Sequence, residues 1–186
     1  MNEDKELVAL VLGRTPGSFE ELVQRHQQLV WHMVQRMVKH PEETRELCQE
    51  VFLRVHRNLS GFRFESTLST WIGSIAFSVA NRHLQRKRLE IVEDDGELEP
   101  LVERVGDDFD LEAACADEQL VAHMRAAVDT LPSVQRVVVS LYHLDELGIA
   151  EVSAITGLPA GTVKSHLFRA RLRLEQKLDR YVEDKT

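Results

Sequence analysis

The sequence predicts an all-α protein of two small helical domains joined by a flexible acidic linker. Apolar residues recur at helical intervals through most of the 186-residue chain, and no segment shows the alternation of a strand. The charge falls in three blocks: residues 1–88 carry a net +3, residues 89–119 a net −12 and residues 120–186 a net +1. Dense like charge and weak periodicity in the middle block predict a tether, so the outer blocks are the predicted domains.

The N-terminal block is predicted to form three amphipathic helices that pack as a bundle. The first begins at Ser18, which has capping-box spacing to Glu21, and continues to the break at Pro41. The second follows directly and ends near residue 60. The third, capped by Thr67 or Ser69, runs to about residue 88.

The third predicted helix gathers cations in its last two turns and follows a loop that contains aromatic rings. The cations and rings are Arg82, Arg86, Lys87, Arg88, Phe62, Phe64 and Trp71, the last on the first turn of the helix. Rings beside cations are what single-stranded DNA requires of a binding surface. Two alternatives stay open: the cations complement the helix dipole, and each ring fills the core.

The C-terminal block is predicted to end in a helix-turn-helix. Two supporting helices meet at Pro132, which suits the first turn of the second. A short apolar pattern over residues 149–155 then ends at Gly157, and Thr162 can cap a new helix beyond it. Two short helices with a Gly-containing turn form a motif whose second helix enters a DNA major groove.

The last predicted helix has a packing face and an outer face. Val163, Leu167, Ala170 and Leu174 fall within one narrow arc, and no acidic residue lies between Gly157 and Leu174. Cations, hydroxyls and one aromatic ring suit phosphates and base edges. The candidate DNA-contacting residues are Thr162, Lys164, Ser165, His166, Phe168, Arg169 and Arg171. The alternative is an ordinary amphipathic helix with a solvated basic face.

Composition excludes several other classes of protein. Cys48 and Cys115 stand far apart with no metal-ligand spacing, which argues against a zinc site or disulfide framework and fits a reducing cytoplasm. The histidines form no H-E-x-x-H motif, and no G-x-S-x-G or Walker-type loop occurs. The acidic N-terminus resembles neither a signal peptide nor a membrane span. We therefore expect neither an enzyme nor a cofactor or metal.

The run GTVKSHLFRAR over residues 161–171 is close to a family signature. Together with the residues from 131 to 174, it resembles the promoter −35-reading domain of bacterial sigma factors of the extracytoplasmic-function group. His166 stands where Arg is more usual. The resemblance implies that this domain reads the −35 duplex.

Residues 46–88 resemble the sigma domain that binds core RNA polymerase and melts the −10 element. The L-x-Q-E-x-F pattern implies docking on the clamp helices of the polymerase β′ subunit. The residues implied in that contact are Glu46, Leu47, Gln49, Glu50 and Phe52.

The same resemblance implies that the loop after residue 62 captures a flipped-out −10 base, and that the following helix holds the melted strand. The implied −10 residues are Arg63, Phe64, Glu65, Ser66, Thr67, Trp71, Ser78, Asn81, Arg82 and Arg86. Unstacking a base costs free energy that a pocket and stacking partners must repay. Ser78 stands where Asn is more usual.

The segment ETREL, residues 43–47, departs from the more acidic D-A-E-D-L of the family because Arg45 replaces an acid. One hypothesis is that phosphorylation of Thr44 restores the acidic character needed for polymerase docking. An ordinary exposed threonine is the alternative.

These observations predict a sigma factor that directs core RNA polymerase to specific promoters in the cytoplasm. The resemblance further implies an anti-sigma factor as an inhibitory partner. It also places the acidic linker near the active-site cleft and RNA exit path of the polymerase, with solubility as the alternative role. The rival hypothesis is a two-domain transcriptional regulator, which would need neither the polymerase pattern nor the aromatic loop in the first 88 residues.

Overall fold

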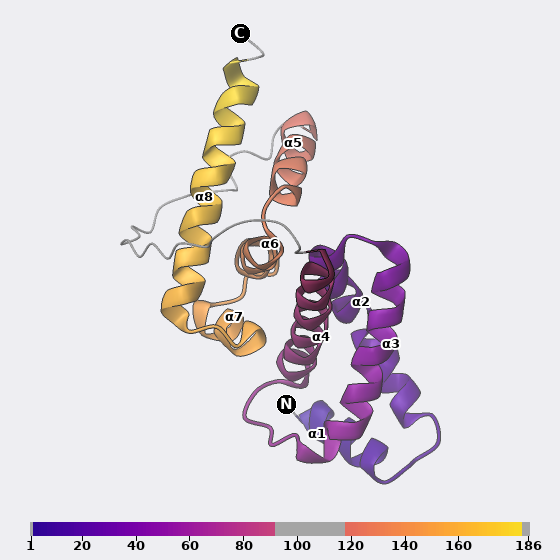
Figure 1. The fold of residues 1–186 in the computed structure, drawn as a ribbon. Helices are drawn as coiled ribbons and strands as arrows, with labels where there is room; N and C mark the ends of the chain where they lie inside the picture. Colours follow the sequence, from indigo (N-terminus) through magenta and orange to yellow (C-terminus); the bar gives the residue numbers. More distant parts are fainter. Residues whose placement is uncertain (1, 92–117, 184–186) are drawn as a thin grey trace. The chain divides into compact units, whose positions relative to one another are not determined.

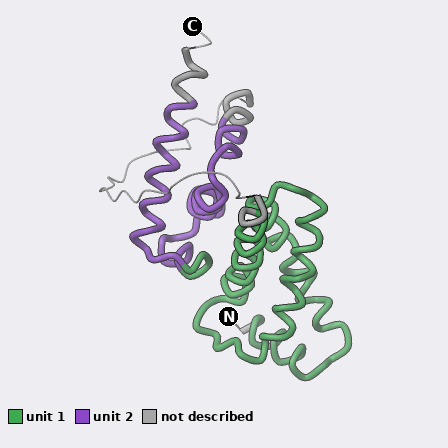
Figure 2. The backbone as a smooth tube through the Cα atoms, viewed as in Figure 1, with its two compact units in different colours: residues 1–96, 154–157 green, residues 97–153, 158–186 purple. Residues whose placement is uncertain are grey.

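The computed structural model describes residues 2–91 and 118–183, which form eight α-helices and no strand (Figure 1). The chain divides into two compact units, residues 1–96 with 154–157 and residues 97–153 with 158–186 (Figure 2). This confirms the all-α prediction. Residues 92–117, most of the predicted linker, lie outside the described residues, and the predicted domain boundaries stay a prediction.

The first unit is a bundle of three long helices with a shorter helix packed against it. Its elements are α1 (Asn2–Leu12), α2 (Ser18–Val38), α3 (Pro41–Asn58), the 3₁₀ turn η1 (Leu59–Gly61) and α4 (Leu68–Ile91). Helices α2, α3 and α4 pack against one another, and α1 packs on α2 and η1 (Figure 1). Their inner faces are fully buried at Leu22, Val30, Val34, Val51, Val55, Ile72 and Ala76. The three predicted helices are confirmed.

Helix α1 is absent from the sequence prediction. Its buried residues Leu7, Val8 and Val11 do have helical spacing, but the pattern is short and follows acidic residues. An isolated helix of 11 residues is marginal in water. Packing on α2 and η1 supplies the stability that local sequence lacks.

The predicted capping box at Ser18 and Glu21 is wrong. Gly17 caps α2 with φ of 80°, and its carbonyl accepts a hydrogen bond from the amide of Glu21 over 3.0 Å. The Ser18 hydroxyl donates instead to the carbonyl of Thr15 over 2.7 Å. Because glycine adopts this left-handed backbone at little cost, α2 begins without a side-chain cap.

The second unit packs shorter helices against one long helix. Its elements are α5 (Glu118–Asp129), α6 (Ser133–Val139), a π turn (Ser140–Leu144), the first five residues of α7 (Ile149–Thr156) and α8 (Ala160–Glu183). Helix α8 packs on α5 and α6. The shared core cluster consists of Ala127, Leu131, Val139, Ala170 and Leu174. This core fixes which side of α8 remains accessible.

Candidate functional site

Helices α7 and α8 form the predicted helix-turn-helix. A three-residue turn, 157–159, joins them, and Gly157 has φ of 70°, which suits the glycine that ends a helix. Helix α8 begins at Ala160 because the amides of Thr162 and Val163 donate to the carbonyl of Pro159 over 2.8 and 3.0 Å. The predicted Thr162 cap is therefore wrong, and Thr162 lies within the first turn.

The outer face of α8 carries the predicted −35 residues. Val163 and Ala170 are fully buried, as the packing arc predicts, while Lys164 is exposed. Leu172 is 42% exposed and marks an apolar end to the face. The half-buried members are Thr162, Ser165, His166, Phe168, Arg169 and Arg171. The structure thus brings all seven predicted residues onto the N-terminal half of one helix.

Several polar groups of this face already have partners within α8. The Ser165 hydroxyl donates to the carbonyl of Gly161 over 2.9 Å, and Arg171 pairs with Glu175 over 2.8 Å. The Nδ1 atom of His166 is buried without a hydrogen-bond partner. Burial, and then the charge of Arg169, lower the pKa of His166 from its ordinary value, which favours the neutral ring. The cationic character of the face therefore rests on Lys164, Arg169 and Arg171.

The loop before α4 is built around three aromatic rings. Phe62 is buried, at 8% exposure, and its ring centroid lies 4.7 Å from Phe64 and 5.1 Å from Trp71. Phe64 and Trp71 are half-buried, so each keeps part of its ring accessible. Thr67 caps α4, because its hydroxyl oxygen accepts a hydrogen bond from the amide of Thr70 over 3.1 Å. The core alternative is thus correct for Phe62, while Phe64 and Trp71 sit at the surface.

The predicted −10 residues of α4 share one outer side of the helix. Ser78, Arg82 and Arg86 are exposed and Asn81 is half-buried. In the preceding loop, the exposed members are Arg63, Glu65, Ser66 and Thr67. The positions from 78 to 86 repeat at helical spacing, so these side chains present two cations, one amide and one hydroxyl along a single stripe.

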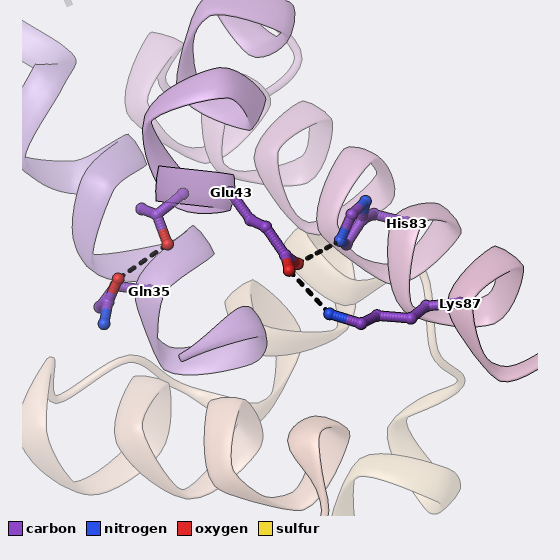
Figure 3. Close-up of polar contacts among 5 residues, drawn as sticks. Gln35, Glu43, His83 and Lys87 are labelled. Carbon is purple, nitrogen blue, oxygen red and sulfur yellow. Dashed lines mark hydrogen bonds and ion pairs between the residues drawn. The ribbon is translucent and has the colours of Figure 1, made fainter. Parts of the chain in front are cut away.

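Lys87 of the predicted basic cluster, together with His83 on the same helix, is held by Glu43 at the start of α3. Its carboxylate accepts hydrogen bonds from Lys87 and His83, both over 2.7 Å, and Figure 3 shows both α4 side chains directed at it. The two hydrogen bonds, of which the one from Lys87 has the larger effect, lower the pKa of Glu43 to about 2. Lys87 therefore ties α4 to α3, whereas Arg82 and Arg86 lie on the exposed stripe. The side chain of Arg88 lies outside the described part.

Helices α2 and α3 enclose an apolar groove of about 760 Å³ on the surface of the first unit. Phe52 and Gln49, two residues of the L-x-Q-E-x-F pattern, line it together with Trp31 and Leu53. Trp31 is 37% and Leu53 56% exposed, so the groove offers large apolar side chains to a partner. Sequence patterning missed Trp31 and Leu53 because they fall outside the motif.

Not every predicted polymerase-binding residue faces this surface. Glu46, Gln49 and Glu50 are exposed and Phe52 is half-buried. Leu47 is only 7% exposed and belongs to the core, and its predicted role as a contact stays a prediction. It occupies the inner side of α3, one turn away from Val51.

The Thr44 phosphorylation hypothesis is contradicted by burial. Thr44 is fully buried, and its hydroxyl donates to the side-chain oxygen of Gln35 on α2 over 2.7 Å (Figure 3). A kinase cannot reach this hydroxyl without separating α2 from α3. The alternative of an exposed threonine is wrong for the same reason.

No group of three or more His, Cys, Asp or Glu side chains is placed to hold a metal ion within residues 2–91 and 118–183. In the same part of the chain, no helix is long and apolar enough to cross a membrane.

Comparison with known proteins identifies both halves of the chain. Residues 22–90 match the family model of sigma-70 region 2, and residues 123–174 match that of sigma-70 region 4. The ECF RNA polymerase sigma-E factor of Escherichia coli K12 is 31% identical over 187 residues, covering 94% of both chains. The chain belongs to the extracytoplasmic-function sigma factors. This group is not a family of enzymes.

Other sigma factors match along nearly the whole chain. The RNA polymerase sigma-H factor of Pseudomonas aeruginosa is 26% identical over 181 residues, covering 95% of this chain and 94% of the relative. The solved structure of the sigma factor RpoE with the anti-sigma factor NepR from Bartonella quintana superposes with a TM-score of 0.63 at 20% identity. It covers 88% of this chain and 98% of that one, which shows a shared fold.

Proposed function

We propose that this sigma factor binds core RNA polymerase in the cytoplasm and directs it to specific promoters. The α2–α3 groove docks the polymerase, with Gln49, Glu50 and Phe52 in the contact. The loop over residues 62–67 and the outer stripe of α4 hold the melted −10 strand, while the outer face of α8 reads the −35 duplex. The chain itself catalyses no reaction and needs no cofactor.

The apolar groove is the observation that carries the proposal. Trp31 and Leu53 expose large apolar surfaces beside Phe52, and such a surface fits a protein partner better than it fits DNA. A regulator that only bound DNA would need the α8 face but no second surface of this kind. The groove and the DNA-facing residues in one chain therefore favour a polymerase subunit over the rival regulator.

The charge distribution indicates that promoter binding depends on the polymerase. The two flanking blocks carry net charges of only +3 and +1, whereas tight binding to duplex DNA relies on many phosphate contacts. We expect the isolated chain to bind promoter DNA poorly and the holoenzyme to bind it specifically. Tight, sequence-selective binding by the isolated chain at moderate salt would contradict this expectation.

Transcription in vitro with purified core polymerase tests the proposed function. RNA start sites are mapped on genomic templates with core polymerase alone and with the chain added. New start sites preceded by shared −10 and −35 sequences support the proposal. Unchanged start sites, together with no measurable affinity for core polymerase, would favour the regulator.

The structural relatives also support an inhibitory partner for this chain. The sigma factor RpoE was solved in complex with the anti-sigma factor NepR, and CnrH, which shares the fold with a TM-score of 0.62 at 18% identity, was solved in complex with the cytosolic domain of CnrY. An anti-sigma factor that covered the α2–α3 groove would prevent polymerase docking. Co-purification of the tagged chain from its own host, followed by release of transcription when the partner is removed, tests this part of the proposal.

A further inference from the structure

Helix α1 contacts the loop to which the proposed function assigns the −10 strand. The Asp4 carboxylate accepts a hydrogen bond from the backbone amide of Leu68, the first residue of α4, over 3.2 Å. The Lys5 ammonium group lies over the Phe64 ring, 5.8 Å from its centroid. Two consecutive residues of α1 therefore contact this region: Lys5 contacts the Phe64 ring, and Asp4 contacts the point where the loop joins α4.

Phe64 has a backbone conformation that its surroundings must hold in place. Its φ is 57°, in the left-handed region that a bulky side chain rarely adopts. Such outliers persist where neighbouring groups fix them, and they concentrate at binding sites. Two of its neighbours are the Phe62 ring, whose centroid lies 4.7 Å away at an interplanar angle of 53°, and the Lys5 ammonium group over the ring.

Helix α1 is itself firmly attached, so it can act as a support. Leu7, Val8 and Val11 bury at least nine-tenths of their surface, and α1 packs on α2 and η1. Asp4 also places a negative charge at the N-terminus of α4, where the helix dipole favours it. The start of α4 is thus fixed from α1 as well as by the Thr67 cap.

We propose that Asp4 and Lys5 are positioning residues for recognition of the −10 element. Asp4 fixes the junction between the loop and α4, and Lys5 orients the Phe64 ring so that its accessible side can stack on an unpaired base. This inference rests on the proposed function, since it refines how the loop over residues 62–67 recognises its strand.

The test uses holoenzyme assembled from core polymerase and the full chain. Open-complex formation is measured on an intact promoter, on promoters with single-base −10 substitutions, and on promoters with −35 substitutions. In Lys5→Gln, the preference for the intact −10 element should fall about two- to fivefold, the size of an exposed cation–ring contact. The −35 preference should stay unchanged. Lys5→Arg keeps a cation over the ring and should restore the −10 preference.

Two further variants separate positioning from general effects of charge or stability. Asp4→Ala removes the acceptor for the Leu68 amide and should lower the −10 preference, whereas Asp4→Asn keeps a side-chain oxygen there and should restore it. Glu3→Gln is the matched control, because Glu3 is 85% exposed on the same helix and pairs only loosely with Arg25, over 3.8 Å. It should behave as wild type.

The outcomes distinguish this inference from the proposed function. If wild-type holoenzyme selects promoters but Lys5→Gln and Asp4→Ala keep the full −10 preference, the inference is overturned and the function stands. If open-complex formation falls equally on all −10 sequences, Lys5 is a phosphate contact. If the −10 and −35 preferences fall equally, α1 is a general support. Either result also overturns the inference. If wild-type holoenzyme selects no promoter, the proposed function fails and the inference falls with it.

Discussion

The outer face of α8 and the loop before α4 are the two proposed DNA-binding surfaces, and they are built in different ways. On α8, residues within one helix form the surface, and the buried Val163 and Ala170 set its orientation. The loop instead depends on a backbone contact from Asp4 and on a ring pair between Phe62 and Phe64. A surface on one helix can therefore be read from its periodicity, whereas a surface assembled from several elements cannot. Substitutions in each region test this difference.

The largest effect is expected where two helices of the first unit share a buried polar contact. Thr44→Glu would place a carboxylate at a fully buried position and should lower the free energy of unfolding by more than about 3 kcal/mol. Lys164→Glu on the exposed α8 face should change stability by less than about 0.5 kcal/mol. Urea unfolding checks both, with tryptophan fluorescence for the first unit and circular dichroism for the whole chain.

Both tryptophans of the chain, Trp31 and Trp71, belong to the first unit, so fluorescence follows that unit. Thr44→Ser keeps a hydroxyl for Gln35 and serves as the control. A Thr44→Glu chain as stable as wild type would show that the α2–α3 contact is open in solution.

Leucines on the inner and outer sides of α3 should respond differently to truncation, because the outer side belongs to the proposed polymerase surface. Leu47→Ala should cost about 2–4 kcal/mol of stability because Leu47 is 7% exposed and its truncation leaves a cavity. Leu53, at 56% exposure, should tolerate the same change within about 0.5 kcal/mol. Leu53→Ala should instead weaken binding to core polymerase severalfold. A stable Leu53→Ala chain with unchanged core affinity would remove the groove from the docking surface.

On α8, side-chain type should decide whether a residue affects specificity or affinity. Arg169→Ala should lower the preference for the intact −35 element by about 1–3 kcal/mol if its guanidinium contacts a base. Lys164→Ala should weaken binding to all −35 sequences alike, because an exposed ammonium group suits a phosphate. Filter-binding with holoenzyme on substituted promoters measures both. An unchanged preference in Arg169→Ala would exclude this residue from base contact.

The smallest effect concerns the ion pair that joins α3 to α4. The pKa of Glu43 is lowered to about 2 by Lys87 and His83, so its charged form stabilises the folded chain above the ordinary pKa of 4.5. That contribution is lost as the pH falls towards 2. We expect the free energy of unfolding of wild type to exceed that of Glu43→Gln by about 0.5–1 kcal/mol at pH 6. This difference should shrink below pH 4.5. A difference that stays constant with pH would contradict the assigned pairing.

Sequence reasoning located the elements whose determinants are local. The three long helices of the first unit, the three-residue turn before α8 and the packing side of α8 all follow from apolar spacing and turn residues. Thr67 is one of the two predicted caps of α4, and its hydroxyl oxygen accepts a hydrogen bond from the amide of Thr70. These features need no knowledge of distant residues.

The missed or wrong features depend on contacts between distant parts of the chain. Glu43 meets His83 and Lys87 from 40 and 44 residues away, and Asp4 meets Leu68 from 64 residues away. Thr44 is buried because α2 covers it, which its polar neighbours in the sequence do not reveal. Tertiary packing, rather than local preference, decided each of these cases.

One measurement directly tests whether the two proposed DNA surfaces recognise different promoter elements. Open-complex formation by holoenzymes that carry Trp71→Ala or Arg169→Ala is compared on promoters with an altered −10 or an altered −35 element. We expect Trp71→Ala to lose discrimination at −10 alone and Arg169→Ala to lose it at −35 alone. Loss of discrimination at both elements in either variant would contradict this expectation.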